Sequence, residues 1–296
     1  MKPRLSREDV WIGRWTQALR SHRLPGLRHG LGHDCAVLAA PSAGFDLVLK
    51  TDAVVEGVHF LRSTSAPLAG RKAIARVLSD LAAAGATPRA ALVTAGCPDK
   101  KSAVRLQSMY RGLAQAARRW GVTVVGGETV RTRQLLLSIS LLGTVPRGSS
   151  PHRGGARPGH LLFVTGTLGG SWPRRHLTFT PRLREGQWLA RKKIPSAMMD
   201  LSDGLGADLP RLARMSRVGF RLDPRRLPLA PGATPRQALT CGEDYELLFA
   251  VPKNKAARLR KTWPFSTRLT EIGFCLPARS GFHSGGISLQ GYDHLR

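Results

Sequence analysis

Apolar positions divide the first half of the chain into segments that alternate between strand-like and helix-like patterns. Ser6 and Asp9 predict a capped helix start, which apolar residues from Val10 to Leu19 follow at helical spacing. Farther along, the pattern predicts strands at 45–52, 90–96, 121–129 and 134–145, and helices at 71–86 and 102–120.

Residues 146–160 (PRGSSPHRGGARPGH) are rich in Pro, Gly, Ser and Arg, a composition typical of a linker between domains. The second half then repeats the alternation: strands are predicted at 161–166, 197–200 and 246–251, and helices at 183–193, from Ser202, and at 253–263. We therefore expect an α/β or α+β fold in two lobes, with an N-terminal domain at 1–148 and a C-terminal domain at 149–296.

Composition supports a folded protein of one large or two smaller domains, because the chain has 296 residues and 42% of them are hydrophobic. Its four cysteines lie far apart without a CxxC pair, which disfavours a zinc site or a disulfide framework and fits a reducing compartment. The opening residues precede no apolar segment of a signal peptide, and no apolar run is long enough to span a bilayer. We expect a cytoplasmic protein without a membrane span.

The chain is strongly basic, with 46 Lys and Arg residues against 19 Asp and Glu residues and a formal charge of +27. The basic residues recur along the chain, and no zinc finger, RRM signature or KH loop accompanies them. Dedicated nucleic-acid binding is therefore the weaker interpretation, since the same positive field attracts phosphorylated small molecules.

The few acidic residues concentrate in short motifs of small and apolar residues. Asp52, Glu128 and Asp200 each fall where a predicted strand ends, and ligands of such folds gather at strand ends. Asp80 lies within an Ala-rich helix, where a carboxylate buried without a partner is costly. Because the surrounding groups are mostly hard oxygen donors, the pattern favours magnesium, which binds carboxylates and bridges to phosphates.

Several further signals are weaker. Asp203 equally fits the cap of the following helix, and Asp208 is explained better by a cap or a surface turn. No Walker-type P-loop is present, although the Gly-rich turn at 165–171 offers backbone amides. Arg153 fits bidentate pairing with a phosphate as well as it fits an ordinary exposed arginine.

Eight motifs occur in one order: GHDCAVL (32–38), TDAVVEGVHF (51–60), LSDLAAAGATP (78–88), GGET (126–129), HRGGARPGH (152–160), MDLSDGL (199–205), CGEDYELLF (241–249) and GYDH (291–294). Together they resemble the thiamine-monophosphate kinases, a family of the aminoimidazole-ribonucleotide-synthetase-like superfamily, from about residue 31 to the C-terminus. The motifs EGVHF and GEDYELLF favour this branch over selenophosphate synthetase and aminoimidazole-ribonucleotide synthetase, which share the architecture.

The resemblance implies a two-lobed fold whose first lobe forms a homodimer through its sheet, with ATP and several Mg²⁺ ions in the cleft. It implies the metal ligands Asp34, Thr51, Asp52, Asp80, Glu128, Asp200 and Asp203. It implies nucleotide contacts from Gly127, Glu128, Arg153 and Ser202, with Arg153 and Asp203 as the catalytic residues. It implies contacts with thiamine monophosphate from His59, Glu243 and Tyr292.

The implied reaction transfers a phosphoryl group from ATP to thiamine monophosphate, giving thiamine diphosphate and ADP. The acceptor is a phosphate monoester that is largely ionised at neutral pH, since its second pKa is about 6, so no general base is needed. The obstacle is repulsion between two polyanions. We expect direct in-line transfer, promoted by positioning and by neutralisation of charge.

The chain departs from the family pattern close to the expected site. His33 stands where a second aspartate is usual, and Lys50 stands where a small hydroxyl residue is common. Glu128 replaces an aspartate, and His160 replaces an acidic residue. The segment after residue 171 is also shorter than in relatives. Because the remaining aspartates are intact, we expect an active enzyme with fewer bound metals or a weaker affinity for magnesium.

Three alternatives stay open. The first is another ATP-dependent enzyme of the superfamily, although the N-terminal segment lacks the reactive cysteine typical of selenophosphate synthetase. The second is a degenerate relative that binds nucleotide without turnover. The third is a basic nucleic-acid-binding protein built on a retired enzyme fold, which would bind DNA or RNA with a steep dependence on salt.

Overall fold

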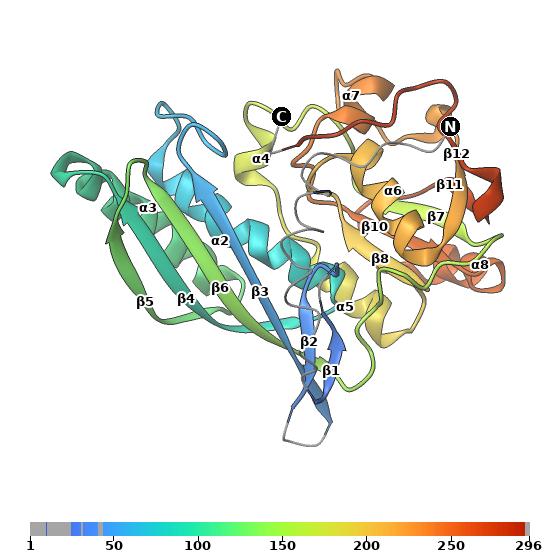
Figure 1. Cartoon of the computed structure of the whole chain (residues 1–296), viewed down its shortest axis with the longest axis horizontal. Helices are drawn as coiled ribbons and strands as arrows, with labels where there is room; N and C mark the ends of the chain where they lie inside the picture. Colours follow the sequence, from blue (N-terminus) through green and yellow to red (C-terminus); the bar gives the residue numbers. More distant parts are fainter. Residues whose placement is uncertain (1–9, 11–24, 31, 41–43, 294–296) are drawn as a thin grey trace.

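The computed structural model describes residues 10, 25–30, 32–40 and 44–293, so most of the helix predicted from Ser6 lies outside the described residues. Figure 1 shows two lobes, each built on a β-sheet. The first sheet has the order β1-β2-β3-β6-β4-β5 and the second the order β12-β9-β11-β7-β10-β8. This two-lobed α/β arrangement confirms the predicted fold class.

The first sheet is antiparallel except for the parallel pair β4–β5. Its strands are β1 (Leu27–His29), β2 (Ala36–Ala39), β3 (Phe45–Val55), β4 (Thr87–Cys97), β5 (Thr123–Arg131) and β6 (Leu136–Pro146). Helices α2 (Ala66–Ala83) and α3 (Lys100–Arg119) belong to this lobe, and α2 packs against β3 and β6.

The second sheet is antiparallel except for the parallel pair β9–β12. Its strands are β7 (Leu161–Thr165), β8 (Ala197–Asp200), β9 (Val218–Leu222), β10 (Leu247–Val251), β11 (Leu269–Pro277) and β12 (Phe282–His283). The lobe also holds α4 (Arg175–Thr178), α5 (Leu183–Arg191), α6 (Leu205–Ser216), α7 (Pro235–Thr240), α8 (Lys253–Thr262) and the short 3₁₀ helices η2 (Pro224–Arg226) and η3 (Ala278–Ser280). The domain boundary expected at 148 falls in the segment between β6 and β7.

Helix α2 connects the two lobes. It forms from an Ala-rich stretch with Pro67 in its first turn, and the chain leaves it through Gly85, whose φ of 66° suits glycine. Two glycines let α2 and α3 approach closely, because a Cβ on Gly70 would lie 1.8 Å from the carbonyl oxygen of Met109, and one on Gly112 would lie 1.9 Å from that of Pro67. On its other sides α2 packs against α5 and β8 of the second lobe, so one apolar core runs through both lobes.

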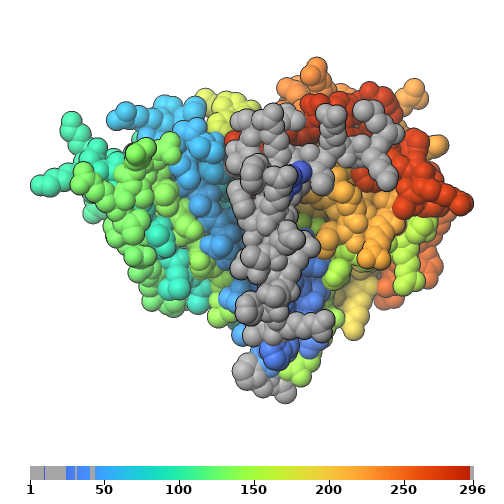
Figure 2. All heavy atoms as spheres, viewed as in Figure 1, coloured from blue at the N-terminus to red at the C-terminus, as the bar shows by residue number. Residues whose placement is uncertain are grey.

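The two faces of the first sheet differ in exposure. Val48, Val93 and Ile139 face the helices and are buried, whereas Leu49 and Leu92, their neighbours along β3 and β4, are 43% and 51% exposed. This second face, which we call the open face, is therefore partly apolar, and the elements that the structure describes leave Leu49 and Leu92 on it exposed. The space-filling view shows the described atoms of the first lobe in blue to green and those of the second in yellow-green to red (Figure 2). No helix in the described part of the chain is long and apolar enough to cross a membrane.

Candidate active site

Three buried carboxylates, Asp34, Asp80 and Asp200, meet at the junction of the two lobes. Each offers an oxygen that lies within 4.8 Å of the others. They come from separate places in the chain: the segment before β2, the last part of α2 and the end of β8. Their exposed fractions are only 8%, 7% and 4%. We call these three residues the carboxylate cluster.

Cations and a hydroxyl group surround the carboxylate cluster. Arg153 binds Asp34 with both ends of its fork, at 2.6 Å from Nη2 to Oδ1 and 3.2 Å from Nε to Oδ2. Lys50 Nζ lies 2.8 Å from Asp80 Oδ1. The hydroxyl of Ser79 donates to Asp200 Oδ2 at 2.6 Å. Arg153 thus touches an expected metal ligand, and the unusual Lys50 places an ammonium group at the cluster.

Even so, negative charge remains poorly compensated in the cluster. Burial, together with the charges of Asp200 and Asp52, raises the pKa of Asp80 well above its usual value, although Lys50 opposes this. Burial and the charge of Asp34 raise the pKa of Asp200 to about 7. Such carboxylates hold protons unless a further cation is bound. Buried oxygen donors at this spacing are the groups that magnesium prefers, so the residues fit the ion that the sequence pattern predicts.

The raised pKa of Asp200 gives a testable dependence of stability on pH. The folded chain holds a proton on Asp200 up to about pH 7, whereas the unfolded chain loses it near 3.8. This proton therefore stabilises the fold at low pH, and the contribution is lost as pH rises through about 7. Urea titrations without magnesium measure the free energy of unfolding of the wild type and of Asp200→Asn. We expect the difference, wild type minus variant, to fall by at most about 4 kcal/mol as pH rises from 3.8 to about 7. A difference that is independent of pH contradicts the prediction.

A pocket with about 410 Å³ of open space lies beside the cluster. It is lined by Val58, His59, Arg76, Trp172, Ser202, Asp203, Gly242, Glu243, Tyr245 and Tyr292. We call it the aromatic pocket, because Trp172 and Tyr292 are part of its lining. These two side chains are 42% and 47% exposed, so their rings are accessible to a ligand. The pocket brings together His59, Glu243 and Tyr292, the residues expected to contact thiamine monophosphate. Ser202 and Asp203 connect it to the cluster, since they follow Asp200 along the chain.

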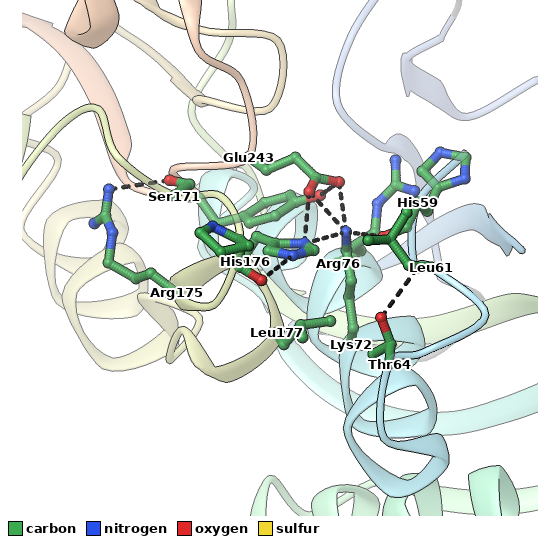
Figure 3. Close-up of polar contacts among 12 residues, drawn as sticks. His59, Leu61, Thr64, Lys72, Arg76, Ser171, Arg175, His176, Leu177 and Glu243 are labelled. Atoms are coloured by element: carbon green, nitrogen blue, oxygen red, sulfur yellow. Dashed lines mark hydrogen bonds and ion pairs between the residues drawn. The ribbon is translucent and has the colours of Figure 1, made fainter. Parts of the chain in front are cut away.

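A buried lysine on α2 holds Glu243 in the pocket wall. Lys72 Nζ lies 2.7 Å from both carboxylate oxygens of Glu243, donates to the carbonyl oxygen of His59 at 2.5 Å, and lies 2.7 Å from His176 Nδ1. Figure 3 shows Lys72 at the centre of these contacts. Burial opposes ionisation of Glu243, but the hydrogen bond with His176 and the charge of Lys72 lower its pKa to about 2. Glu243 is therefore an ionised side chain whose charge Lys72 already balances.

The aromatic wall depends on the short segment after 171. The ring of Trp172 stacks on His176, with centroids 3.9 Å apart, and the indole also lies over Lys72 Nζ at 5.5 Å. Trp172, His176, Lys72 and Arg76 were not predicted as site residues. One signal was available for two of them, because Lys72, Arg76 and Asp80 are spaced four residues apart and so share one face of α2.

Other predicted site residues lie near the cluster but outside it. Asp203 forms an ion pair with Arg211. Asp208 is fully buried; its carboxylate accepts a hydrogen bond from the backbone N–H of Asp203 at 3.0 Å and lies 2.9 Å from Arg211 Nη1. Asp208 is therefore neither a surface turn nor the N-cap of α6, which is Gly204; it lies buried inside the helix and positions its neighbours. Asp52 Oδ2 lies 3.9 Å from Lys50 Nζ.

Thr51, Gly127 and Glu128 are not brought to the carboxylate cluster within one chain. Thr51 points to the open face, where Ser140 Oγ donates to its hydroxyl at 3.1 Å. The register pairs Glu128 with Thr94 and Thr94 with Ser138, which places Glu128 on this face as well. Strand β5 is also three strand spacings from β3, or about 14 Å. The alternation of side chains along β3 explains why Thr51 and Asp52 point to opposite faces.

Comparisons with known proteins agree with this architecture. Residues 32–145 match the family model described as AIR synthase related protein, N-terminal domain. The thiamine-monophosphate kinase of Rhodopirellula baltica is 36% identical over 273 residues, covering 86% of this chain and 85% of the relative. That of Escherichia coli K12 is 35% identical over 271 residues, covering 82% of each chain.

Solved structures of related proteins share this two-lobed architecture. The structure of AaThiL complexed with AMPPCP and TMP is 31% identical, with a TM-score of 0.83 over 97% of this chain and 96% of that one. The crystal structure of thiamine-monophosphate kinase from Stenotrophomonas maltophilia K279a is 29% identical, with a TM-score of 0.75 over 92% of this chain and 95% of that one.

Proposed function

The chain belongs to the thiamine-monophosphate kinases, and we propose that it transfers a phosphoryl group from ATP to thiamine monophosphate where the carboxylate cluster meets the aromatic pocket. The observation that carries the proposal is the adjacency of the carboxylate cluster and the aromatic pocket. Asp200, Ser202 and Asp203 lie within four residues and connect the two. An acceptor seated in the pocket therefore has its reacting end beside the cation ligands.

In this proposal Asp34, Asp80 and Asp200 hold magnesium, with Asp52 and Asp203 as further ligands. Magnesium bound there supplies positive charge that neutralises the phosphate oxygens of donor and acceptor. Arg153 orients Asp34 through its bidentate pair, and its Nη1 donates to the carbonyl oxygen of Gly32 at 2.9 Å. Its remaining N–H groups and its charge are offered to the nucleotide. Ser202 adds a nucleotide contact within one chain, whereas Gly127 and Glu128 would contact the nucleotide only in an assembly of two copies.

The aromatic pocket orients the acceptor. Its aromatic faces, Trp172 and Tyr292, suit the planar rings of thiamine, and the charge of the thiazolium ring favours contact with an indole face. Because the acceptor phosphate is already ionised at neutral pH, the side chains of the pocket need not remove a proton. We infer direct in-line transfer without a phosphoenzyme, since positioning and charge neutralisation are sufficient for this chemistry.

Product analysis tests the proposal. Purified protein is incubated with ATP and magnesium, with thiamine monophosphate, selenide or single-stranded nucleic acid in separate reactions, and the products are separated by chromatography. Formation of thiamine diphosphate and ADP in equal amounts supports the proposal. Selenophosphate as the product, or salt-sensitive nucleic-acid binding without turnover of ATP, would replace it with one of the alternatives.

We also propose that two copies associate through the open face of the first sheet. Leu49, Leu92 and Leu142 lie on this face by strand register, and the first two are among the large apolar residues that one chain leaves exposed. A second copy packed there would bury them. It would also bring a partner's β5 toward β3, which gives Thr51 and Glu128 a site that one chain alone does not form.

We further propose a cytoplasmic location, in keeping with four cysteines that are all free thiols.

Leu92→Glu is expected to produce a monomer, because it places a charge in the centre of the proposed apolar interface. The measurement is molar mass by size-exclusion chromatography with light scattering. Val104→Glu is the matched control, since Val104 is 67% exposed on α3, away from the open face. The proposal fails if the wild type is monomeric, or if both variants keep the mass of the wild type.

A further inference from the structure

Arg76 is a cation in the aromatic pocket whose hydrogen-bonding capacity is only partly used. It lies on α2, and its Nη1 donates to the carbonyl oxygen of Ala53 at 2.7 Å. Its Nε is buried and has no hydrogen-bond partner in the described part of the chain. A buried N–H without a partner is costly, so an arginine held in this way needs an explanation.

Two other arginines with a buried, unpartnered Nε have a carboxylate close by. Arg105 lies 3.5 Å from Glu56, and Arg175 lies 2.6 Å from Asp244. Arg76 forms no ion pair of this kind with the residues that the structure describes. Burial lowers the pKa of Arg76, but Tyr245 and the nearby carboxylates of Asp52, Glu243 and Asp80 raise it above its usual value. None of these groups forms a direct ion pair with Arg76 among the described residues, so its N–H groups can still donate to a ligand, whereas Arg105 and Arg175 are paired within the fold.

The position of Arg76 lies between the two halves of the site. Lys72 precedes it by one helical turn and is bound to Glu243, and Asp80 follows it by one turn and belongs to the carboxylate cluster. Figure 3 shows Arg76 beside Lys72, on the side of His59. Among the described residues that line the pocket, Arg76 is the one lysine or arginine. A ligand with an anionic end and an aromatic end would place the anion at Arg76 and the rings at Trp172.

We propose that Arg76 binds the phosphate group of the acceptor, and so is a further catalytic residue that fixes which end of thiamine monophosphate faces the carboxylate cluster. The inference rests on the proposed function, since the ligand is its acceptor substrate. The guanidinium group offers charge-assisted hydrogen bonds to phosphate oxygens. It also screens the phosphate group of the acceptor from the carboxylates of Asp52 and Asp80, which would otherwise repel it.

Binding of thiamine monophosphate and of unphosphorylated thiamine by isothermal titration calorimetry tests the proposal. In Arg76→Gln we expect the Kd for thiamine monophosphate to rise about 10- to 150-fold, as for loss of a charge-assisted hydrogen bond. The Kd for thiamine should change less than about twofold, because its rings contact other residues. Arg76→Lys, which keeps the charge, is expected to fall between the wild type and Arg76→Gln.

The matched control is Arg71→Gln on the same helix. Arg71 donates to the carbonyl oxygens of Leu177 and Phe179 and does not line the pocket, so we expect a lower Tm and an unchanged ratio of the two Kd values. Equal losses for both ligands in Arg76→Gln, or no loss for either, would overturn the role of Arg76 and leave the proposed function standing. A wild type that does not bind thiamine monophosphate would overturn both.

Discussion

Asp80→Asn is expected to fold normally and to lose at least about a thousandfold in kcat/KM for thiamine diphosphate formation, equivalent to about 4 kcal/mol of transition-state stabilisation. The amide keeps the shape of the carboxylate and removes its charge. The raised pKa of Asp80 shows that burial and the neighbouring carboxylates disfavour this charge when no cation is bound. Its removal should therefore cost little stability without metal, apart from the weakened contact with Lys50, whose Nζ lies 2.8 Å from Asp80 Oδ1. The loss should appear in turnover, where the cation ligand is needed.

Asp46→Asn is the matched control for that variant. Asp46 is also a fully buried aspartate of the first lobe, but its partners are Arg28 at 2.8 Å and the backbone N–H of Gly148 at 2.9 Å, outside the site. We expect a lower Tm in Asp46→Asn with kcat/KM within a few-fold of the wild type, the opposite pattern to Asp80→Asn. Turnover in Asp80→Asn close to that of the wild type would remove Asp80 from the cation site.

Lys72→Met is expected to destabilise the protein by about 3–5 kcal/mol, because it leaves the carboxylate of Glu243 partly buried without its main countercharge. The side chain of Lys72 is fully buried, whereas that of Glu243 is 15% exposed. The free energy of unfolding from denaturant titrations measures the loss. The contacts of Lys72 with Glu243 and with the carbonyl oxygen of His59 further predict weaker binding of thiamine monophosphate.

A double variant separates the two effects of Lys72. Adding Glu243→Gln to Lys72→Met removes the unpaired charge, so much of the stability should return, while the affinity for thiamine monophosphate should stay low. A double-mutant cycle in which the two changes are simply additive would contradict the ion pair as the source of the destabilisation.

Much of the fold could be predicted from local patterns. The strands around 45–52, 134–145 and 197–200 appear as β3, β6 and β8, and the Ala-rich segment from 71 appears within α2. Strands β9 and β11 were not predicted. Their sequences, VGFRL and LTEIGFCLP, show little regular alternation, and they are held mainly by pairing with each other and with β7, which brings together segments far apart in the chain.

The acidic part of the site could be predicted because carboxylates are scarce in this basic chain. Asp34, Asp80 and Asp200 stood out for that reason, and the structure places them together. Lys72 and Arg76 did not stand out, since positive residues are common in the sequence. Their importance comes from burial and from Glu243 and Trp172, which the second lobe supplies. The opposite directions of Thr51 and Asp52 could have been predicted from strand alternation alone.

Binding of Mn²⁺, a paramagnetic substitute for magnesium, tests the central claim most directly. Electron paramagnetic resonance counts the ions bound to the wild type, to Asp80→Asn and to Asp46→Asn, with and without a non-hydrolysable ATP analogue. We expect Mn²⁺ to bind the wild type and Asp46→Asn, to be displaced by magnesium, and to bind Asp80→Asn with fewer ions or much lower affinity. Equal stoichiometry and affinity in all three proteins would show that the cations lie elsewhere.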